Sequence, residues 1–209
     1  MDFSLRIDPA DEAAMELLAR LAQRAEVTPM VHGRGTALVL GGARSGKSSW
    51  AEAQLAGAAD VEYVATSEVL DGDAEWAERV ALHVARRPPS WRTTETKDLA
   101  AVLDADDPAA VLIDCAAVWL DRVLFDAGAW DDAPGWRERV EAEVSRLDDA
   151  LVRTGRDVIV VSNEVGSGIV PATPSGRLYR DELGRLNARL AAVCGEVWLC
   201  TAGIARRLK

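Results

Sequence analysis

The residues best suited to chemistry form a glycine-rich stretch, G-G-A-R-S-G-K-S, directly after the apolar run Ala37–Leu40. The pattern G-x-x-x-x-G-K-[ST] between a strand and a helix is typical of loops that wrap phosphate groups. Its glycines let the backbone turn tightly and bring N–H groups close to phosphate oxygens. Lys47 suits the β- and γ-phosphates, and the Ser48 hydroxyl suits Mg²⁺. We therefore predict a nucleoside triphosphate site at Gly41, Gly42, Ala43, Arg44, Ser45, Gly46, Lys47 and Ser48.

A second candidate is the carboxylate at the end of the apolar run V-L-I-D, residues 111–114. A buried strand that ends in aspartate is common and carries little information alone. Downstream of a phosphate-binding loop, however, Asp114 is placed to hold Mg²⁺ directly or through water. We therefore predict that Ser48 and Asp114 are the metal-binding residues.

A third candidate is the basic stretch at residues 78–88. If this stretch is helical, Arg79, His83, Arg86 and Arg87 share one side. Cationic neighbours lower the pKa of a histidine, and an unprotonated imidazole can attack an electrophilic phosphorus. A solvated basic helix face with an incidental histidine also fits the spacing, and spacing alone favours this interpretation over the nucleophilic one.

Other segments are placed for ligand contact but are ambiguous. The hydroxyls of Ala65-Thr66-Ser67 follow a strand, where such residues also serve as caps. Glu95 ends a short edge strand and is an ordinary surface acid on local grounds. The loop at residues 162–171 follows an apolar strand, on the side of a parallel sheet where ligands bind.

The composition narrows the class of protein. The chain has 209 residues, 49% of them hydrophobic and 28% charged, which suits one sizeable α/β domain. A net charge of −10 argues against a protein that coats nucleic acid. We find no apolar run near the ~18 residues of a membrane span and no signal peptide. Cys115, Cys194 and Cys200 lack C-x-x-C spacing, which favours core residues in a reducing cytoplasm.

Strand and helix patterns alternate along the main body, which predicts a P-loop NTPase-type α/β fold: a mostly parallel sheet with helices on both faces. We expect an N-terminal helical extension at 1–35, with a helix near 9–25, and one domain at 36–209. The predicted strands are 36–40, 61–65, 110–114, 157–161 and 196–201, with a short edge strand at 91–95. The predicted helices are 47–56, 74–86, 97–103, 116–126, 135–152 and 176–193.

Taken together, these segments resemble the bifunctional adenosylcobinamide kinase / adenosylcobinamide-phosphate guanylyltransferase family. The resemblance runs from about Thr36 to the C-terminus, and the first ~35 residues have no counterpart in it. The histidine stretch combined with the loop at 162–171 is its most specific part. The matching segments are L-G-G-A-R-S-G-K-S (40–48), Y-V-A-T-S (63–67), E-R-V-A-L-H-V-A-R-R-P (78–88), W-R-T-T-E (91–95), L-I-D-C (112–115), S-N-E-V-G-S-G-I-V-P (162–171), G-R-L-Y-R-D-E-L-G-R-L-N-A-R-L-A (176–191) and E-V-W-L (196–199).

The resemblance implies phosphorylation of adenosylcobinamide by ATP or GTP, followed by transfer of GMP from GTP through a guanylylated histidine. By position that histidine is His83, with Lys47 as the second catalytic residue. The substrates would be small molecules, with no nucleic acid and no membrane insertion. Family members suggest a homo-oligomer, a trimer with sites at subunit boundaries. The implied nucleotide contacts beyond the glycine-rich loop are Ala65, Thr66, Ser67, Val84, Ala85, Arg86, Arg87, Glu95 and Asp114.

Two alternatives compete with this interpretation. A simple P-loop small-molecule kinase would use the glycine-rich loop and Asp114 but would need no histidine. A regulatory protein switched by nucleotide hydrolysis would bind a protein partner. Retention on the protein of label from the α-phosphorus of GTP would exclude the simple kinase. Turnover of cobinamide with pyrophosphate release would exclude the regulatory protein.

The histidine hypothesis predicts a pH dependence. Only the unprotonated imidazole of His83 is nucleophilic, so the rate of protein guanylylation should fall as the pH drops through the pKa of His83. Neighbouring arginines should hold that pKa below the ordinary histidine value. Single-turnover labelling with GTP across about pH 5 to pH 8 measures it, and a flat rate would contradict the nucleophilic role.

Overall fold

The computed structural model describes residues 35–67 and 87–209. The predicted helices at 9–25 and 74–86 lie outside the described residues, as do His83, Val84, Ala85 and Arg86. Nearly all of the expected extension at 1–35 also lies outside them.

One seven-stranded sheet forms the centre of the described part, in the order β3-β2-β4-β5-β1-β6-β7. All neighbouring strands are parallel except β6 and β7, which pair antiparallel. A mostly parallel sheet was predicted, and this prediction is confirmed. The strands are β1 (Thr36–Gly41), β2 (Val61–Ala65), β3 (Arg92–Glu95), β4 (Ala110–Asp114), β5 (Val158–Asn163), β6 (Glu196–Thr201) and β7 (Ile204–Arg207).

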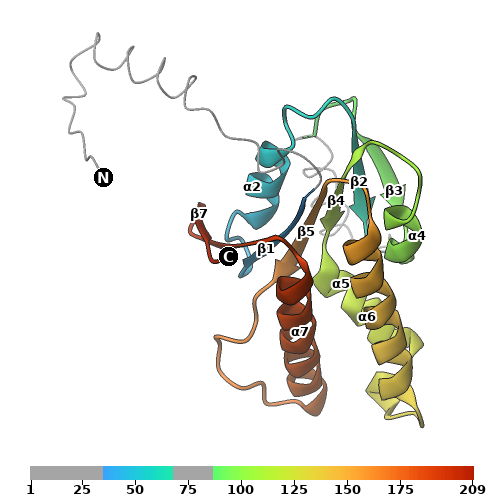
Figure 1. Cartoon of the computed structure of the whole chain (residues 1–209). Coiled ribbons are helices and arrows are strands. Elements are labelled where there is room, and N and C mark those ends of the chain that lie inside the picture. Colours follow the sequence, from blue (N-terminus) through green and yellow to red (C-terminus); the bar gives the residue numbers. More distant parts are fainter. Residues whose placement is uncertain (1–34, 68–86) are drawn as a thin grey trace, which may run out of the picture.

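Helices cover both faces of this sheet (Figure 1). The chain moves one way along the sheet from β1 to β2, and the opposite way from β3 through β4 and β5 to β6. Because parallel crossovers are right-handed, α2 lies on one face and the later helices lie on the other. The helices are α2 (Lys47–Gln54), α4 (Leu99–Leu103), α5 (Ala116–Asp126), α6 (Trp136–Arg153) and α7 (Pro174–Val193), with a short 3₁₀ turn η1 (Ala129–Asp131).

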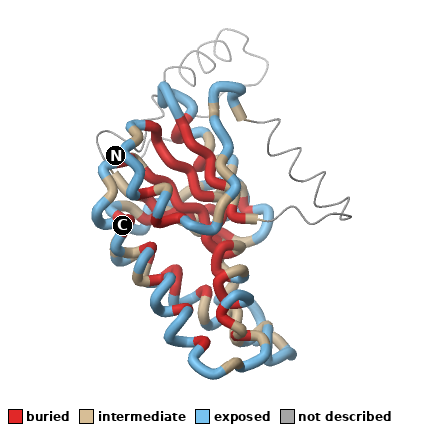
Figure 2. The backbone as a smooth tube through the Cα atoms, turned by 90° about the vertical axis from the view of Figure 1, so that its right-hand side faces the viewer, coloured by how far each residue is buried: buried red, intermediate tan, exposed pale blue. Residues whose placement is uncertain are grey.

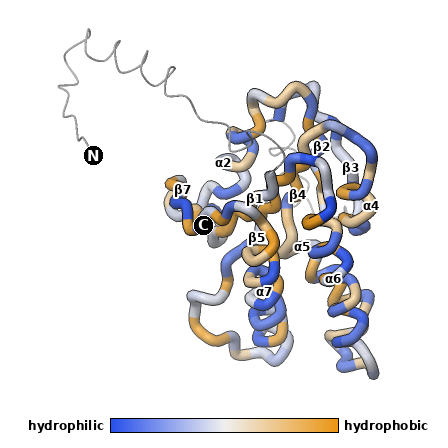
Figure 3. Tube along the Cα trace, viewed as in Figure 1, coloured by the Kyte–Doolittle hydropathy of each residue, from blue (hydrophilic) through white to orange (hydrophobic). Residues whose placement is uncertain are grey.

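The core lies in the sheet and on the inner faces of the helices. The central strands are apolar runs because both of their faces are covered, and Figure 2 shows them almost entirely buried. In α6 the buried residues Val140, Val144, Leu147 and Leu151 recur every three or four positions. Figure 3 shows the matching alternation of hydrophobic and hydrophilic residues along α6 and α7. Among the described residues, no helix is long and apolar enough to cross a membrane.

Helix starts differ from the predicted ones because polar side chains cap them. The Asp98 side chain accepts a hydrogen bond from the Ala101 N–H (3.1 Å), so α4 begins at Leu99 rather than at residue 97. Thr173 accepts one from the Gly176 N–H (3.2 Å), and Pro174 occupies the first turn. α7 therefore begins two residues earlier than predicted.

The sequence pattern missed β7 altogether. Ala202 and Gly203, with φ of 52° and 81°, form the two-residue connection between β6 and β7. The sequences Asn-Gly and Asp-Gly are the strongest indicators of such hairpin turns. The Ala-Gly sequence found here does not indicate one. The residues Ile204–Arg207 are also largely exposed, which gives no alternating pattern to recognise.

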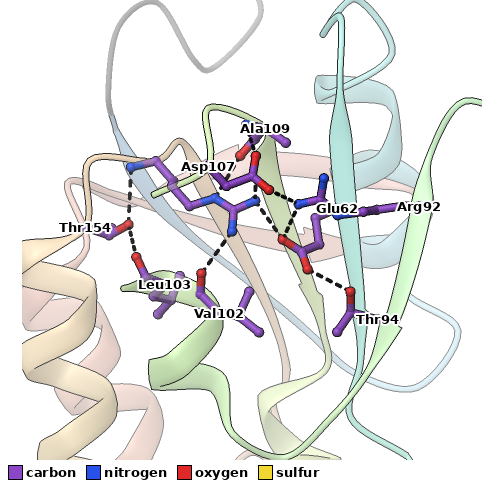
Figure 4. Close-up of polar contacts among 9 residues, drawn as sticks. Glu62, Arg92, Thr94, Val102, Leu103, Asp107, Ala109 and Thr154 are labelled. Atoms are coloured by element: carbon purple, nitrogen blue, oxygen red, sulfur yellow. Dashed lines mark hydrogen bonds and ion pairs between the residues drawn. The ribbon is translucent and has the colours of Figure 1, made fainter. Parts of the chain in front are cut away.

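A buried arginine ties together the amino-terminal ends of the strands. Arg156, 4% exposed, precedes β5. Its Nε donates to the Ala109 carbonyl (2.9 Å) and Nη1 to the Val102 carbonyl (2.9 Å). Nη2 donates to Oε2 of Glu62 (2.7 Å), so one guanidinium joins β2, α4 and the start of β4 (Figure 4).

Glu62 is the anionic centre of the same network. It also accepts hydrogen bonds from Arg92 (2.7 Å) and Thr94 (2.7 Å) of β3. Burial by itself would raise the pKa of Glu62, but the hydrogen bonds from Arg92, Thr94 and Arg156 and the charge of Arg156 outweigh burial and lower it. The network lies at the edge of the sheet opposite the glycine-rich loop, so it stabilises the fold without entering the site.

We predict that Arg156→Met destabilises the protein by about 3–5 kcal/mol, because it leaves Glu62 buried with fewer partners. Chemical denaturation at neutral pH measures the change. Arg153→Met is the matched control, because its pair with Asp104 (3.0 Å) is exposed and should contribute at most about 1 kcal/mol.

The same network predicts an acid dependence. The pKa of Glu62 in the folded protein is below its ordinary 4.5, so ionised Glu62 contributes to the free energy of unfolding above pH 4.5. This contribution is lost as the pH falls through the folded-state pKa of Glu62. Equal losses of unfolding free energy in Arg156→Met and Arg153→Met would contradict the stabilising role of the pair between Arg156 and Glu62.

Candidate nucleotide site

The glycine-rich loop joins the carboxyl end of β1 to the amino end of α2. The Ser45 N–H donates to the Gly42 carbonyl (3.2 Å), and Gly46 has φ of 91°, a conformation that favours glycine. Lys47 begins α2, and its Nζ donates to the Gly42 carbonyl (3.3 Å). The loop therefore curls around the space that a phosphate group would occupy, with the lysine ammonium directed back over it.

Two other segments fix the backbone of this loop. The Glu164 N–H, just after β5, donates to the Gly41 carbonyl (3.0 Å). The Gly203 N–H, in the β6–β7 turn, donates to the Ser45 carbonyl (2.9 Å). A Cβ on Gly46 would lie 3.0 Å from the Gly203 Cα, so the turn packs directly under the loop. The unpredicted hairpin thus supports the phosphate-binding segment.

Asp114 ends β4 at the same edge of the sheet and is partly exposed. Its Oδ2 accepts a hydrogen bond from the Tyr63 hydroxyl (3.1 Å), while Oδ1 has no hydrogen bond to a described residue. Burial first, and then the charge of Asp114, raise the pKa of Tyr63, so the phenol stays protonated and acts as the donor.

The residue types at this edge suit magnesium. Carboxylate and hydroxyl oxygens, as in Asp114 and Ser48, are the hard ligands that Mg²⁺ takes in phosphate-binding sites, where few protein ligands are usual. The described residues contain no cluster of three or more His, Cys, Asp or Glu side chains able to hold a metal. The Mg²⁺ assignment to Ser48 and Asp114 stays a prediction.

A buried clamp joins the ends of β2 and β4. The Thr66 hydroxyl donates to the Cys115 carbonyl (2.8 Å) and accepts from the Cys115 N–H (3.1 Å), and Thr66 is fully buried. The Thr66 carbonyl accepts from Nη1 of Arg122 in α5 (2.8 Å). Among the predicted site residues, the Thr66 side chain is therefore occupied with positioning the strand ends, and Ser67 next to it is partly exposed.

Arg87 is the one member of the predicted segment Val84–Arg87 that the structure describes. Its guanidinium carbon lies 3.3 Å from the centroid of the Tyr63 ring, and its Nη1 donates to the Thr93 hydroxyl (3.2 Å). Its Nε is buried and has no hydrogen-bond partner in the described part of the chain. The structure thus brings Arg87 to the same tyrosine that holds Asp114.

The remaining predicted residues lie at the rim. Glu95 ends β3, is exposed and pairs in register with Ala65 of β2. The loop after β5 contains Ile169, 96% exposed. Asn187 of α7 is buried and accepts a hydrogen bond from the Ser162 hydroxyl (2.7 Å) at the base of that loop.

The cysteines are core residues, as predicted. All three are free and buried. Burial raises the pKa of Cys115 to about 11 and of Cys194 to about 12, and it also raises that of Cys200. They are therefore protonated thiols at neutral pH and are poor nucleophiles.

Sequence reasoning missed Tyr63 and Arg122 as parts of the site. Tyr63 stands in the matched segment Y-V-A-T-S, but a tyrosine in an apolar strand reads as a core residue. Only the pairing of β2 with β3 and β4 reveals its neighbours. The hairpin turn at Gly203 was missed for the reason given above.

The loop between β1 and α2, with an aspartate at the end of a second parallel strand, defines a nucleotide-binding protein of the P-loop NTPase class. A solved ATPase from the type III secretion system of pathogenic bacteria shares the fold, with a TM-score of 0.54 at 14% identity over 81% of this chain and 51% of that one. The family model described as "Cobinamide kinase / cobinamide phosphate guanyltransferase" matches residues 37–208, and the chain belongs to this family.

Curated relatives agree with this assignment. The chain is 41% identical over 180 residues to the bifunctional adenosylcobalamin biosynthesis protein CobU of Escherichia coli (strain K12), covering 82% of this chain and 98% of that protein. It is also 41% identical over 177 residues to the corresponding CobP protein of Pseudomonas aeruginosa, covering 82% and 96%. The sequence-based family prediction is confirmed.

The loop packing gives a direct prediction. A Cβ on Gly41 would lie 2.3 Å from the Ser45 Oγ and 2.8 Å from the Cys200 carbonyl oxygen, whereas one on Gly42 would meet nothing within 4 Å. Gly41→Ala should therefore cost about 1–3 kcal/mol, and Gly42→Ala should leave stability nearly unchanged. Denaturation without nucleotide measures both, and equal stabilities would contradict the packing described.

Proposed function

We propose that this chain phosphorylates adenosylcobinamide with ATP or GTP and then transfers GMP from GTP to adenosylcobinamide phosphate through His83. The products of the second reaction are adenosylcobinamide-GDP and pyrophosphate. Both activities stand in the description of the family to which the chain belongs. The histidine intermediate and the individual site residues are the finer part of the proposal.

The observation that carries it is the position of Arg87. Arg87 follows His83 by four residues and stacks on Tyr63, which in turn bonds Asp114 at the edge that holds the glycine-rich loop. Of the segment that contains His83, Arg87 is described, and its contacts put a cation at the edge of the sheet where phosphates would bind. We propose that His83 meets a nucleotide held by Lys47 at this edge.

In the kinase step, the loop amides and Lys47 hold the β- and γ-phosphates of the donor, and the cobinamide hydroxyl attacks the γ-phosphorus. A new P–O bond forms, the bond between the γ-phosphorus and the β–γ bridging oxygen breaks, the nucleoside diphosphate leaves, and the hydroxyl proton is released to water. Mg²⁺ bound near Ser48 and Asp114 would offset negative charge on the polyphosphate. The lysine ammonium lies beside the loop and needs little movement to reach a phosphate. No histidine is required for this step.

In the transfer step, the unprotonated imidazole of His83 attacks the α-phosphorus of GTP. A P–N bond forms, the bond between the α-phosphorus and the bridging oxygen breaks, and pyrophosphate leaves. The phosphate of adenosylcobinamide phosphate then attacks the same phosphorus. A new P–O bond forms, the P–N bond breaks, and the imidazole is regenerated.

The rest of the functional picture is proposed from the family resemblance and the sequence. The substrates are small molecules, the compartment is the cytoplasm, and the assembly is a homo-oligomer, with a trimer as the expected form. Val84, Ala85, Arg86, Arg87, Glu95 and Ala65–Ser67 are the proposed nucleotide contacts beyond the loop. Residues 1–35 are proposed as a separate extension.

The test uses GTP labelled at either the α- or the γ-phosphorus. The wild type should retain acid-labile label from the α-position only, and His83→Ala should retain none. His83→Ala should still transfer the γ-phosphoryl group to cobinamide, because the kinase step needs the loop rather than the imidazole.

His32→Ala is the matched control, because His32 and His83 are the two histidines of the chain. It should label like the wild type, and Lys47→Ala should lower both activities by at least about a hundredfold. Label retained in His83→Ala, or no label on the wild type, would overturn the proposed transfer step.

A further inference from the structure

We propose that Tyr63 is a positioning residue that holds the Asp114 carboxylate with its hydroxyl and the Arg87 guanidinium with its ring face. The inference rests on the proposed function for the identity of the nucleotide, but its geometry is independent of the histidine chemistry. Nothing in the sequence pattern distinguishes this tyrosine from an ordinary core residue.

Tyr63 is built into the sheet and has little freedom. It stands in the middle of β2, 4% exposed, in register with Thr93 of β3 and Leu112 of β4. Because side chains alternate along a strand, Tyr63 shares its face with Ala65 and, across the register, with Asp114. Because the backbone of Tyr63 is paired on both sides and its side chain is buried, its ring has a fixed position in the fold.

The hydroxyl end orients the carboxylate. Tyr63 donates to Oδ2 of Asp114 at 3.1 Å, and Oδ1 has no hydrogen bond to a described residue. Within residues 35–67 and 87–209, one oxygen is thus engaged and the other has no hydrogen-bond partner. Outer hydrogen bonds of this kind fix the direction of a metal-binding carboxylate and affect metal affinity by about 10- to 100-fold.

The ring face orients the cation. The guanidinium carbon of Arg87 lies 3.3 Å from the ring centroid, and Nη1 is held by Thr93. Stacking uses the π-face of the guanidinium and leaves its in-plane N–H groups for hydrogen bonds. Its Nε is buried without a partner among the described residues, a donor suited to a phosphate oxygen.

The arrangement separates two opposite charges that both serve a bound triphosphate. Arg87 lies over the face of Tyr63, and Asp114 lies at its hydroxyl. Loss of the Tyr63 side chain would remove both the ring contact of the cation and the hydrogen bond to the anion. One neutral, buried side chain therefore sets the position of both.

The experiment separates the two contacts with two variants. Tyr63→Phe keeps the ring and loses the hydroxyl, and Tyr63→Leu loses both. Tyr179→Phe is the matched control, because the Tyr179 hydroxyl donates to the Ala117 carbonyl (2.9 Å) and touches neither Asp114 nor Arg87.

GTP binding is measured by equilibrium dialysis as a function of Mg²⁺ concentration, in a His83→Ala background so that no transfer chemistry contributes. Tyr63→Phe should raise the Mg²⁺ concentration at half-saturation about tenfold and leave Mg²⁺-free GTP binding unchanged. Tyr63→Leu should in addition weaken Mg²⁺-free GTP binding. Tyr179→Phe should change neither quantity.

Thermal denaturation of the same variants identifies a purely structural role. If Tyr63→Phe and Tyr179→Phe lose similar stability and the Mg²⁺ half-saturation does not move, Tyr63 is only a core residue and the inference is wrong. Failure of the transfer chemistry shows itself separately, as absence of guanylyl label on the wild-type protein.

Discussion

Closure of the glycine-rich loop against the rest of the sheet is the constraint on which the site depends. Its backbone is held by the Glu164 N–H from β5 and by the Gly203 N–H from the β6–β7 turn. A loop that must bind phosphate through its own amides has to be rigid before the ligand arrives, because ordering it afterwards would weaken binding. The hairpin and the β5 terminus supply that rigidity, and Gly41 and Gly46 permit the close approach.

The stabilising network and the candidate site lie at opposite ends of the strands of the sheet. At the amino edge, Arg156 and Glu62 satisfy each other and join three elements in a buried network. At the carboxyl edge, Lys47 bonds the glycine-rich loop, Asp114 bonds Tyr63, and the buried Nε of Arg87 has no hydrogen-bond partner among the described residues. A buried donor without a partner is costly inside a protein, which supports the proposal that Arg87 has a ligand at this edge.

Much of the fold and part of the site could be predicted from local pattern. The glycine-rich loop, the aspartate that ends β4 and the alternation of strands with helices all have short-range signals. Tyr63 could not be found in this way, because its role arises from the pairing of β2 with β3 and β4 and from an arginine 24 positions later in the sequence. β7 was missed because its turn uses Ala-Gly and its residues are exposed. The proposed histidine role rests on family resemblance, since spacing alone favours a solvated basic helix face.

The most direct test of the account is mass spectrometry of the protein after exposure to GTP and Mg²⁺, with peptide mapping of any adduct. The account predicts a single GMP adduct on the peptide that contains His83, removed when adenosylcobinamide phosphate is added. An adduct on another residue, or one that adenosylcobinamide phosphate does not discharge, would contradict it.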